Sequence, residues 1–297
     1  MTFLTRFAPS PTGPLHLGHA YSALLAHDMA RANGGRFFLR IEDIDQGRSK
    51  PAWEKQIYDD LDWLGIHWDG PTLRQSDNLS LYSQALDKLW KTDFLYPCTC
   101  TRRDIAEAAS APQEGAPMFG PDGMIYPNTC PMQYKRLPPS FSERPTGLTL
   151  RFCLPAFSHL AVKDISGDRF YFQETGLGPN GETGLISIPA EHLETNIGDI
   201  VLARKDMGTS YHLSVVLDDA MQGITHVVRG QDLFEATAIH VVLQRVLGLP
   251  TPAYHHHKLI RDDHGKRLAK RDDARAISRY RAEGATPDDI RAMVGLE

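Results

Sequence analysis

The chain has 297 residues, of which 41% are hydrophobic and 23% are charged, and its formal net charge is −5. This length suits one large domain or two smaller ones, and the apolar content is ample for a packed core. The negative charge argues against nucleic-acid binding by bulk charge. No segment approaches the roughly 20 apolar residues that span a bilayer, and none resembles a signal peptide. We therefore expect a cytoplasmic protein without membrane partners.

Strand and helix patterns alternate over the first part of the chain. Residues 3–10, FLTRFAPS, predict a short buried strand that ends in a proline-rich turn. Residues 16–33 place apolar side chains near one face and stop at a Gly-Gly pair, which predicts a helix. A second strand at 36–43 and a second helix at 51–64 follow. This order predicts a parallel sheet with crossover helices.

The middle of the chain has a different composition. Residues 109–191 are rich in Pro, Gly and Ser and contain short strand patterns, which indicates an insertion between two halves of the sheet. The role of its Gly-rich stretch, 175–184, stays open. The strand–helix pattern resumes with a strand at 225–230 and a helix at 232–247, and the tail after Ala274 has a helical pattern.

The stretch RFAPSPTGPLHLGHA combines a tight turn with the predicted start of the first helix. A helix start has unpaired N–H groups and a partial positive charge, so it suits an anion. His16 and His19 lie three residues apart on one face of this turn, and Gly18 leaves room for a flat ligand beside the backbone. The pattern predicts a nucleoside triphosphate site, although a histidine pair at a helix start is more often ordinary surface or capping.

Several motifs carry a family resemblance. PSPTGPLHLGHA resembles the first signature of class I aminoacyl-tRNA synthetases, with Leu17 in the second place of the HIGH tetrapeptide. RFAPSPTG and RIEDID resemble the glutamyl branch in particular, and the resemblance continues through residues 211–233. It implies ATP as a substrate, accompanied by Mg²⁺, and it gives a catalytic and ATP-binding role to the helix start, with His16, Gly18 and His19.

The segment GKRLAKRDD resembles the second, KMSKS-type signature of this family. Arg267 replaces the first lysine and Ala269 replaces the serine, whereas Lys270 is kept, and the resemblance assigns Lys270 to ATP binding and catalysis. Charge alone would equally suit a basic turn or a solvated helical face. The substitutions at Arg267 and Ala269 leave the contribution of those two positions open.

The resemblance also implies a glutamate pocket, which it assigns to Arg6, Phe7, Ala8, Pro9, Ser10, Glu42, Tyr211 and Arg229. Glu42 suits an α-ammonium group, and the two arginines suit a side-chain carboxylate, because guanidinium binds carboxylate bidentately. Glutamine would leave the donors of a cation unpaired, so glutamate is the expected substrate. The alternative is that these arginines form structural ion pairs.

The cysteines suggest a metal site. Metal binding or plain burial is expected of them in a cytosolic chain, more than a disulfide, and C-x-C alone is weak evidence for zinc. The resemblance implies a structural Zn²⁺ site in the pattern C-x-C…Y-x3-C, with Cys98, Cys100, Tyr126 and Cys130 as ligands. Cys153 lies in an apolar strand pattern and is expected to be buried.

The expected fold is α/β. A Rossmann-like parallel-sheet catalytic domain has its halves at 1–97 and 192–250, an insertion with the candidate zinc site lies at 98–191, and the KMSKS-type loop and C-terminal helices occupy 251–297. Only a short tail follows the second signature, so no anticodon-binding domain is expected.

The short tail, RIEDID and YPCTC resemble one group in this family, the glutamyl-queuosine tRNA(Asp) synthetases. That resemblance implies activation of L-glutamate with ATP and its transfer to the queuosine base in the anticodon loop of tRNA(Asp). Two alternatives stay open: a truncated glutamyl-tRNA synthetase that charges tRNA(Glu), and a non-catalytic paralogue that binds ATP or tRNA. Retention of His16, His19, Glu42 and Lys270 argues against the non-catalytic alternative.

Overall fold

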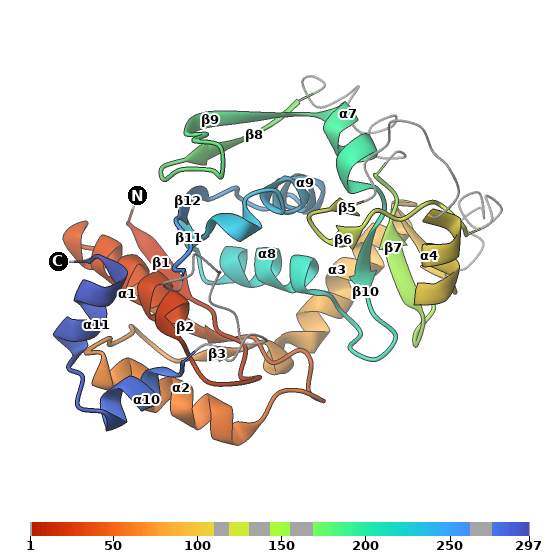
Figure 1. Ribbon diagram of the computed structural model, residues 1–297. Coiled ribbons are helices and arrows are strands. Elements are labelled where there is room, and N and C mark those ends of the chain that lie inside the picture. The colour runs from red at the N-terminus through yellow and green to blue at the C-terminus, as the bar shows by residue number, and fades with distance from the viewer. Residues whose placement is uncertain (1, 110–118, 131–142, 155–168, 262–274, 297) are drawn as a thin grey trace.

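The structure is a computed structural model that describes residues 2–109, 119–130, 143–154, 169–261 and 275–296 (Figure 1). Its first sheet has three parallel strands in the order β1-β2-β3: β1 (Leu4–Phe7), β2 (Arg36–Ile41) and β3 (Leu73–Arg74). The strands predicted at the start of the chain are therefore present and parallel.

A second sheet continues beside β1. It has the order β11-β12-β8-β9, made of β8 (Arg169–Glu174), β9 (Gly184–Pro189), β11 (His226–Gly230) and β12 (Ala253–His257). β8, β12 and β11 are parallel, and β9 is antiparallel at the edge. The amide of Thr225, just before β11, donates to the carbonyl of Leu4 at 3.0 Å, so the two sheets adjoin along β1 and β11. The predicted α/β fold with a parallel sheet is confirmed.

Helices connect and cover these strands: α1 (Leu17–Ala32), α2 (Pro51–Trp63), α3 (Leu79–Lys91), α8 (Tyr211–Met221) and α9 (Thr237–Leu247). Two short 3₁₀ turns, Gln75–Asn78 and Gln231–Leu233, precede α3 and α9. α1 ends where Gly34 takes a positive φ of 61°, which glycine adopts at no steric cost. The helix predicted at 232–247 is in fact a 3₁₀ turn followed by α9.

The segment between α3 and α8 forms a separate antiparallel sheet in the order β10-β7-β4: β4 (Leu95–Cys98), β7 (Thr149–Phe152) and β10 (Ile200–Ala203). Nearby lie α4 (Arg102–Ala109), the hairpin of β5 (Phe119–Gly120) and β6 (Gly123–Met124), and α7 (Ala190–His192) with the π-helical turn Leu193–Ile197. β8 and β9 also come from the predicted insertion, yet they extend the sheet of β11 and β12. The predicted domain boundaries stay a proposal.

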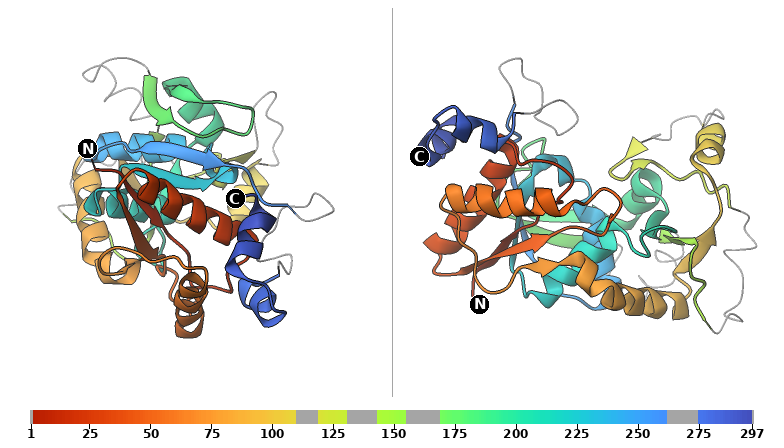
Figure 2. Two further views of the ribbon diagram at one scale, coloured as in Figure 1. Left: turned by 90° about the vertical axis from the view of Figure 1, so that its left-hand side faces the viewer. Right: turned by 90° about the horizontal axis from the view of Figure 1, so that it is seen from below.

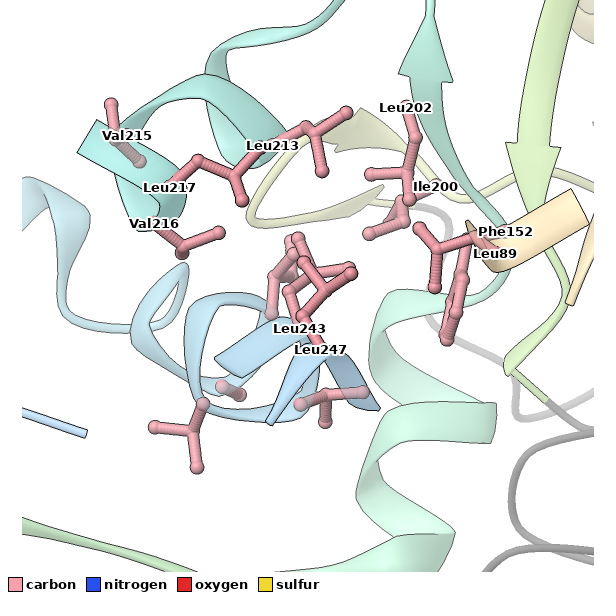
Figure 3. Close-up of a cluster of buried hydrophobic side chains, with 14 of the residues drawn as sticks. Leu89, Phe152, Ile200, Leu202, Leu213, Val215, Val216, Leu217, Leu243 and Leu247 are labelled. Carbon is pink, nitrogen blue, oxygen red and sulfur yellow. The ribbon is translucent and has the colours of Figure 1, made fainter. Parts of the chain in front are cut away.

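One apolar core joins the antiparallel sheet to the helices of the second half. Leu213 and Leu217 of α8 face Leu243 of α9, and Phe152 and Ile200 close the other side (Figure 3). Each such fully buried side chain stabilises the fold by about 1.5–3 kcal/mol. This contact packs the antiparallel sheet of the insertion against α8 and α9.

The C-terminal helices, α10 (Ile277–Ala282) and α11 (Pro287–Val294), pack against the first half of the chain (Figures 1 and 2). Ile277 and Ile290 are fully buried beside α1, and the amide of Ile277 donates to the carbonyl of Leu15 at 2.8 Å. The predicted helical tail is therefore confirmed. Among the described residues, no helix has both the length and the apolar character that crossing a membrane requires.

Candidate active site

A cavity of about 490 Å³ lies where the carboxyl ends of β1 and β11 meet the start of α1. The carboxyl edge of an open α/β sheet is the usual ligand site of such folds. The cavity lining includes the described residues that were predicted to bind ATP or glutamate: Arg6, Phe7, Ala8, Pro9, Ser10, His16, Gly18, His19, Glu42, Tyr211 and Arg229. Segments far apart in the sequence thus converge on one site, and the role of each residue stays a prediction.

The two histidines build the start of α1 itself. His16 is the N-cap of the helix and not part of its first turn: its Nδ1 accepts from the amide of Gly18 at 3.1 Å. The Nδ1 of His19 accepts from the amide of His16 at 3.2 Å. Because Nδ1 accepts in both rings, a neutral ring carries its proton on Nε2, where it can serve as a donor. A Cβ on Gly18 would lie 3.1 Å from Cε1 of His16, so glycine lets this ring pack against the helix start.

Arg6 is held on the cavity wall by Asp219 of α8. The Nε of Arg6 donates to Oδ1 of Asp219 at 2.9 Å and its Nη2 donates to Oδ2 at 3.3 Å. Arg40, which is fully buried, donates to the same Oδ1 at 2.5 Å. Burial alone would raise the pKa of Asp219, but the two guanidinium groups outweigh it and lower this pKa to about 2. Asp219 is therefore ionised at neutral pH.

Glu42 follows β2 and faces the cavity from the same wall. The Nη2 of Arg40 donates to its Oε1 at 3.2 Å. Burial raises the pKa of Glu42 above its ordinary value, and the nearby charges of Arg40 and Arg6 offset this only in part. A cationic group entering the cavity would supply the missing compensation, as expected for the α-ammonium of an amino acid.

Arg229 lies on the opposite wall, in β11. It donates hydrogen bonds to His256 (Nε to Nε2, 3.1 Å), His240 (Nη1 to Nδ1, 3.0 Å), Thr237 (Nη2 to Oγ1, 2.8 Å) and the carbonyl of Leu233 (Nη2, 3.2 Å). Arg229 is only 6% exposed and lines the cavity. Its orientation is thus set by groups from β12 and the α9 region.

A second cavity of about 600 Å³ adjoins the first and shares Ser10, Thr12, Glu42 and Tyr211 with it. Its lining includes three arginines: Arg48 from the segment between β2 and α2, Arg102 from the insertion, and Arg204 just after β10. Burial raises the pKa of Tyr211, which is therefore a neutral phenol between the two cavities.

The predicted metal ligands also meet in space. The Sγ atoms of Cys98, Cys100 and Cys130 lie within 4.8 Å of one another. The Oη of Tyr126 is 3.2 Å from Sγ of Cys100 and 3.6 Å from Sγ of Cys98. Three thiol groups and one oxygen around one point match the coordination number of Zn²⁺, so the donor set fits this ion.

Hydrogen bonds around this cluster favour a thiolate at Cys98. Burial alone would raise the pKa of Cys98, but the hydrogen bond that Arg151 donates to its Sγ, together with the hydrogen bond between Cys98 and Tyr126, outweighs burial and holds this pKa below the ordinary value. Burial raises the pKa of Cys130. Cys153 is buried in the same apolar cluster, as predicted, and lies outside the group of three thiols.

Comparison with known families decides the classification. Residues 2–296 match the catalytic domain of the class I tRNA synthetases for glutamate (E) and glutamine (Q). The chain belongs to this family. A glutamyl-Q tRNA(Asp) synthetase of Rhodobacter capsulatus is 62% identical over 99% of this chain and 100% of the relative. A protein of the same name from Symbiobacterium thermophilum is 41% identical over 96% of this chain and 83% of the relative.

Solved structures in this class I family share the fold. The glutamate-tRNA synthetase of Elizabethkingia anophelis matches with a TM-score of 0.74 and 26% identity. A glutamate tRNA ligase of Elizabethkingia meningosepticum, in complex with its amino acid, matches with a TM-score of 0.73 and 28% identity. Each match covers 100% of this chain and 61% of the solved chain, so the chain spans less than two thirds of the length of those synthetases.

Sequence reasoning on this class I chain missed the residues behind the cavity wall. Asp219 lies in the apolar run VVLDDAM and Arg40 in the strand RFFLRI, and a charge within an apolar run is a signal of a buried partner. No sequence signal connects His240 or His256 to Arg229. The predicted ATP ligand Lys270, with Arg267 and Ala269, lies outside the described residues.

Proposed function

We propose that this chain activates L-glutamate with ATP to form glutamyl-adenylate and transfers the glutamate to the queuosine base in the anticodon loop of tRNA(Asp). The observation that carries the proposal is the cavity in which Arg6, Arg229 and Glu42 converge beside the start of α1. The relative that is 62% identical along the whole chain has the corresponding name.

The start of α1 would bind the triphosphate. Its helix dipole favours phosphate oxygens, and the Nε2–H groups of His16 and His19, whose Nδ1 atoms accept from backbone amides, would add donors. Mg²⁺ would arrive with ATP as part of the substrate. Lys270 remains the expected cation of the second signature.

The opposite part of the cavity would hold glutamate. Glu42 binds the α-ammonium group, and Arg6 and Arg229 bind the side-chain carboxylate. The α-carboxylate then attacks the α-phosphorus of ATP, the bond to pyrophosphate breaks, and pyrophosphate leaves. A carboxylate is already ionised at neutral pH, so this step requires positioning and positive charge but no general base.

In the second step, a hydroxyl of the cyclopentene diol of queuosine attacks the carbonyl carbon of the adenylate. An ester bond forms, the bond to the phosphate oxygen breaks, and AMP leaves while the hydroxyl proton passes to AMP or solvent. The adjoining cavity lies on the side of the insertion and gives access to the site that holds the activated carbonyl.

Two measurements test the proposal. ATP–pyrophosphate exchange should require glutamate and proceed without tRNA, and labelled glutamate should be transferred to queuosine-containing tRNA(Asp). Periodate cleavage of the diol should abolish the transfer. Transfer to tRNA(Glu) instead would favour a truncated glutamyl-tRNA synthetase, and absence of exchange would favour a non-catalytic protein.

We also propose that Cys98, Cys100, Tyr126 and Cys130 hold a structural Zn²⁺ that stabilises the loop-rich insertion. The purified chain should contain zinc, and a chelator should lower its melting temperature. Cys100→Ser should lose the metal, whereas Cys153→Ser, a matched change in the same apolar cluster, should keep it. Equal zinc content in both variants would contradict the assignment.

A further inference from the structure

The hydrogen bonds of Arg229 determine which ring nitrogens carry protons. A guanidinium group has only donors, so each atom that it contacts must accept. The Nε2 of His256 and the Nδ1 of His240 both receive an N–H of Arg229, at 3.1 and 3.0 Å. Neither nitrogen therefore carries a proton, and both rings are neutral while these bonds exist.

Each neutral ring then carries its proton on the opposite nitrogen, where the structure provides an acceptor. The Nδ1 of His256 lies 2.6 Å from Oε2 of Glu174, a buried carboxylate. The Nε2 of His240 lies 3.1 Å from Nδ1 of His212, whose own Nε2 lies 3.3 Å from Oδ1 of Asp122. Two directed hydrogen-bond chains thus run from Arg229 through imidazole rings to carboxylates.

The positive charges of Arg6 and Arg229 are compensated to different extents. Arg6 contacts the carboxylate of Asp219 directly, and that carboxylate compensates its charge. Arg229 forms no ion pair with any carboxylate that the structure describes, and the oxygen atoms of Glu174 lie beyond a full imidazole ring. Arg229 is therefore fixed in position while its positive charge stays available to an anion in the cavity.

We propose that His240 and His256 are positioning residues for the substrate carboxylate: as neutral imidazoles of opposite tautomer, they orient Arg229 without compensating its charge. This inference rests on the proposed glutamate activation for the identity of the anion. It assigns His240 to the Nε2–H tautomer and His256 to the Nδ1–H tautomer. These assignments apply to the protein without bound substrate.

The surroundings keep both rings neutral. Burial lowers the pKa of His240 well below its ordinary value, and the charge of Arg229 acts in the same direction. Burial also lowers the pKa of His256, and the hydrogen bond with Glu174 offsets this only in part. Within the described part of the chain, the charged and titratable groups around this cluster come from several elements. They are Arg6 of β1, Arg40 of β2, Glu42 after β2, Asp122 between β5 and β6, Glu174 of β8, Tyr211, His212 and Asp219 of α8, and Tyr254 and His255 of β12.

The tautomers can be read directly from the ¹⁵N shifts of the histidine rings at pH 7. His240→Gln and His256→Asn identify the two signals by their disappearance. Nε2 protonation at His240 and Nδ1 protonation at His256 would support the inference. The reverse tautomer at either ring, or an imidazolium signal, would overturn it, and this measurement requires no substrate and no active enzyme.

Steady-state exchange kinetics separate positioning from general stability. His240→Leu removes the acceptor and should raise KM for glutamate about tenfold or more, with kcat changed less than about threefold. His240→Gln offers an amide oxygen to Arg229 and an amide N–H to His212, so its KM should stay within about threefold of the unchanged chain. The control is His255→Gln: His255 lies on β12 beside His256, but its ring contacts Thr175 and not Arg229, so KM should be unchanged.

An equal KM in the Leu and Gln variants, or a fall in kcat alone, would overturn the inference. If His240→Leu does not fold, the ring shifts of the unchanged protein still decide the question. If the unchanged chain shows no glutamate-dependent exchange, the proposed function fails, while the tautomer assignment is judged by the ring shifts alone.

Discussion

On the cavity wall formed by β1 and β2, Arg6 is held by a carboxylate, whereas on the wall formed by β11 and β12, Arg229 is held by imidazole rings, a hydroxyl and a carbonyl oxygen. We call these the carboxylate wall and the imidazole wall. Both present a guanidinium group to the same cavity. They differ in how much of its charge remains uncompensated.

The comparison shows two ways to fix a cation in a buried position. A direct ion pair gives strong positional control, but the carboxylate also cancels most of the field that a ligand would experience. Neutral acceptors satisfy the hydrogen-bond donors of Arg229 but do not compensate its positive charge. An anionic ligand at the imidazole wall would supply that compensation. The carboxylate wall should therefore contribute more to stability, and the imidazole wall more to substrate affinity.

The largest expected effect is on the carboxylate wall. Asp219→Ala removes the carboxylate that Arg6 and Arg40 share, so the buried Arg6 loses its ion pair and Arg40 keeps only those with Glu42 and Asp218. The free energy of unfolding should fall by about 3–5 kcal/mol, measured by urea denaturation. The matched control is Asp59→Ala, which removes the exposed pair with Lys55 and should cost less than about 1 kcal/mol. If both variants lost a similar free energy of unfolding, the larger stabilising role of the carboxylate wall would be contradicted.

On the imidazole wall, the expected effect is on affinity. Arg229→Ala removes the cation that faces the substrate carboxylate, and KM for glutamate in the exchange assay should rise roughly 30-fold or more. Arg31→Ala, which breaks the half-exposed pair with Asp69, should leave KM unchanged. An Arg229→Ala enzyme with an unaltered KM would remove Arg229 from the glutamate pocket.

The smallest expected effect is a difference in pH dependence. The pKa of Asp219 is lowered to about 2 in the folded state, so its stabilisation is present above its ordinary pKa of 3.8 and is lost between about pH 4 and pH 2. The pKa values of His240 and His256 are lowered from 6.5, so unfolding takes up protons and stability falls as the pH drops below 6.5.

Urea denaturation of the unchanged chain and of His240→Gln between pH 7.5 and 5.5 tests this difference. The variant lacks one titrating ring, so its stability should fall less steeply, by at most about 1.4 kcal/mol per pH unit. Burial also lowers the pKa of His255, so His255→Gln should flatten the profile in the same direction and compares a ring that contacts Thr175 and not Arg229. Parallel profiles for the unchanged chain and His240→Gln would show that His240 does not titrate in this window.

Much of the site could be predicted because its residues lie in contiguous motifs. Turn chemistry and periodicity located β1, α1 and β2, and the family resemblance pointed to Arg6, Glu42 and Arg229 from the residues around them. The C-x-C and Y-x3-C patterns likewise indicated a cysteine cluster that the structure brings together. The prediction of a continuous helix at 232–247 was wrong at its N-terminal end. A 3₁₀ turn, Gln231–Leu233, comes first there, and α9 begins only at Thr237.

The sequence by itself determined the family, the alternating α/β pattern and the residues that face the cavity, since these depend on local propensity and on short motifs. Only the tertiary structure decided what lies behind them. Asp219 meets Arg6 across 213 positions, and Glu174 meets His256 across 82 positions. Hydrogen bonds between such distant side chains leave no periodic signal, because they depend on how packed strands and helices bring separate segments together.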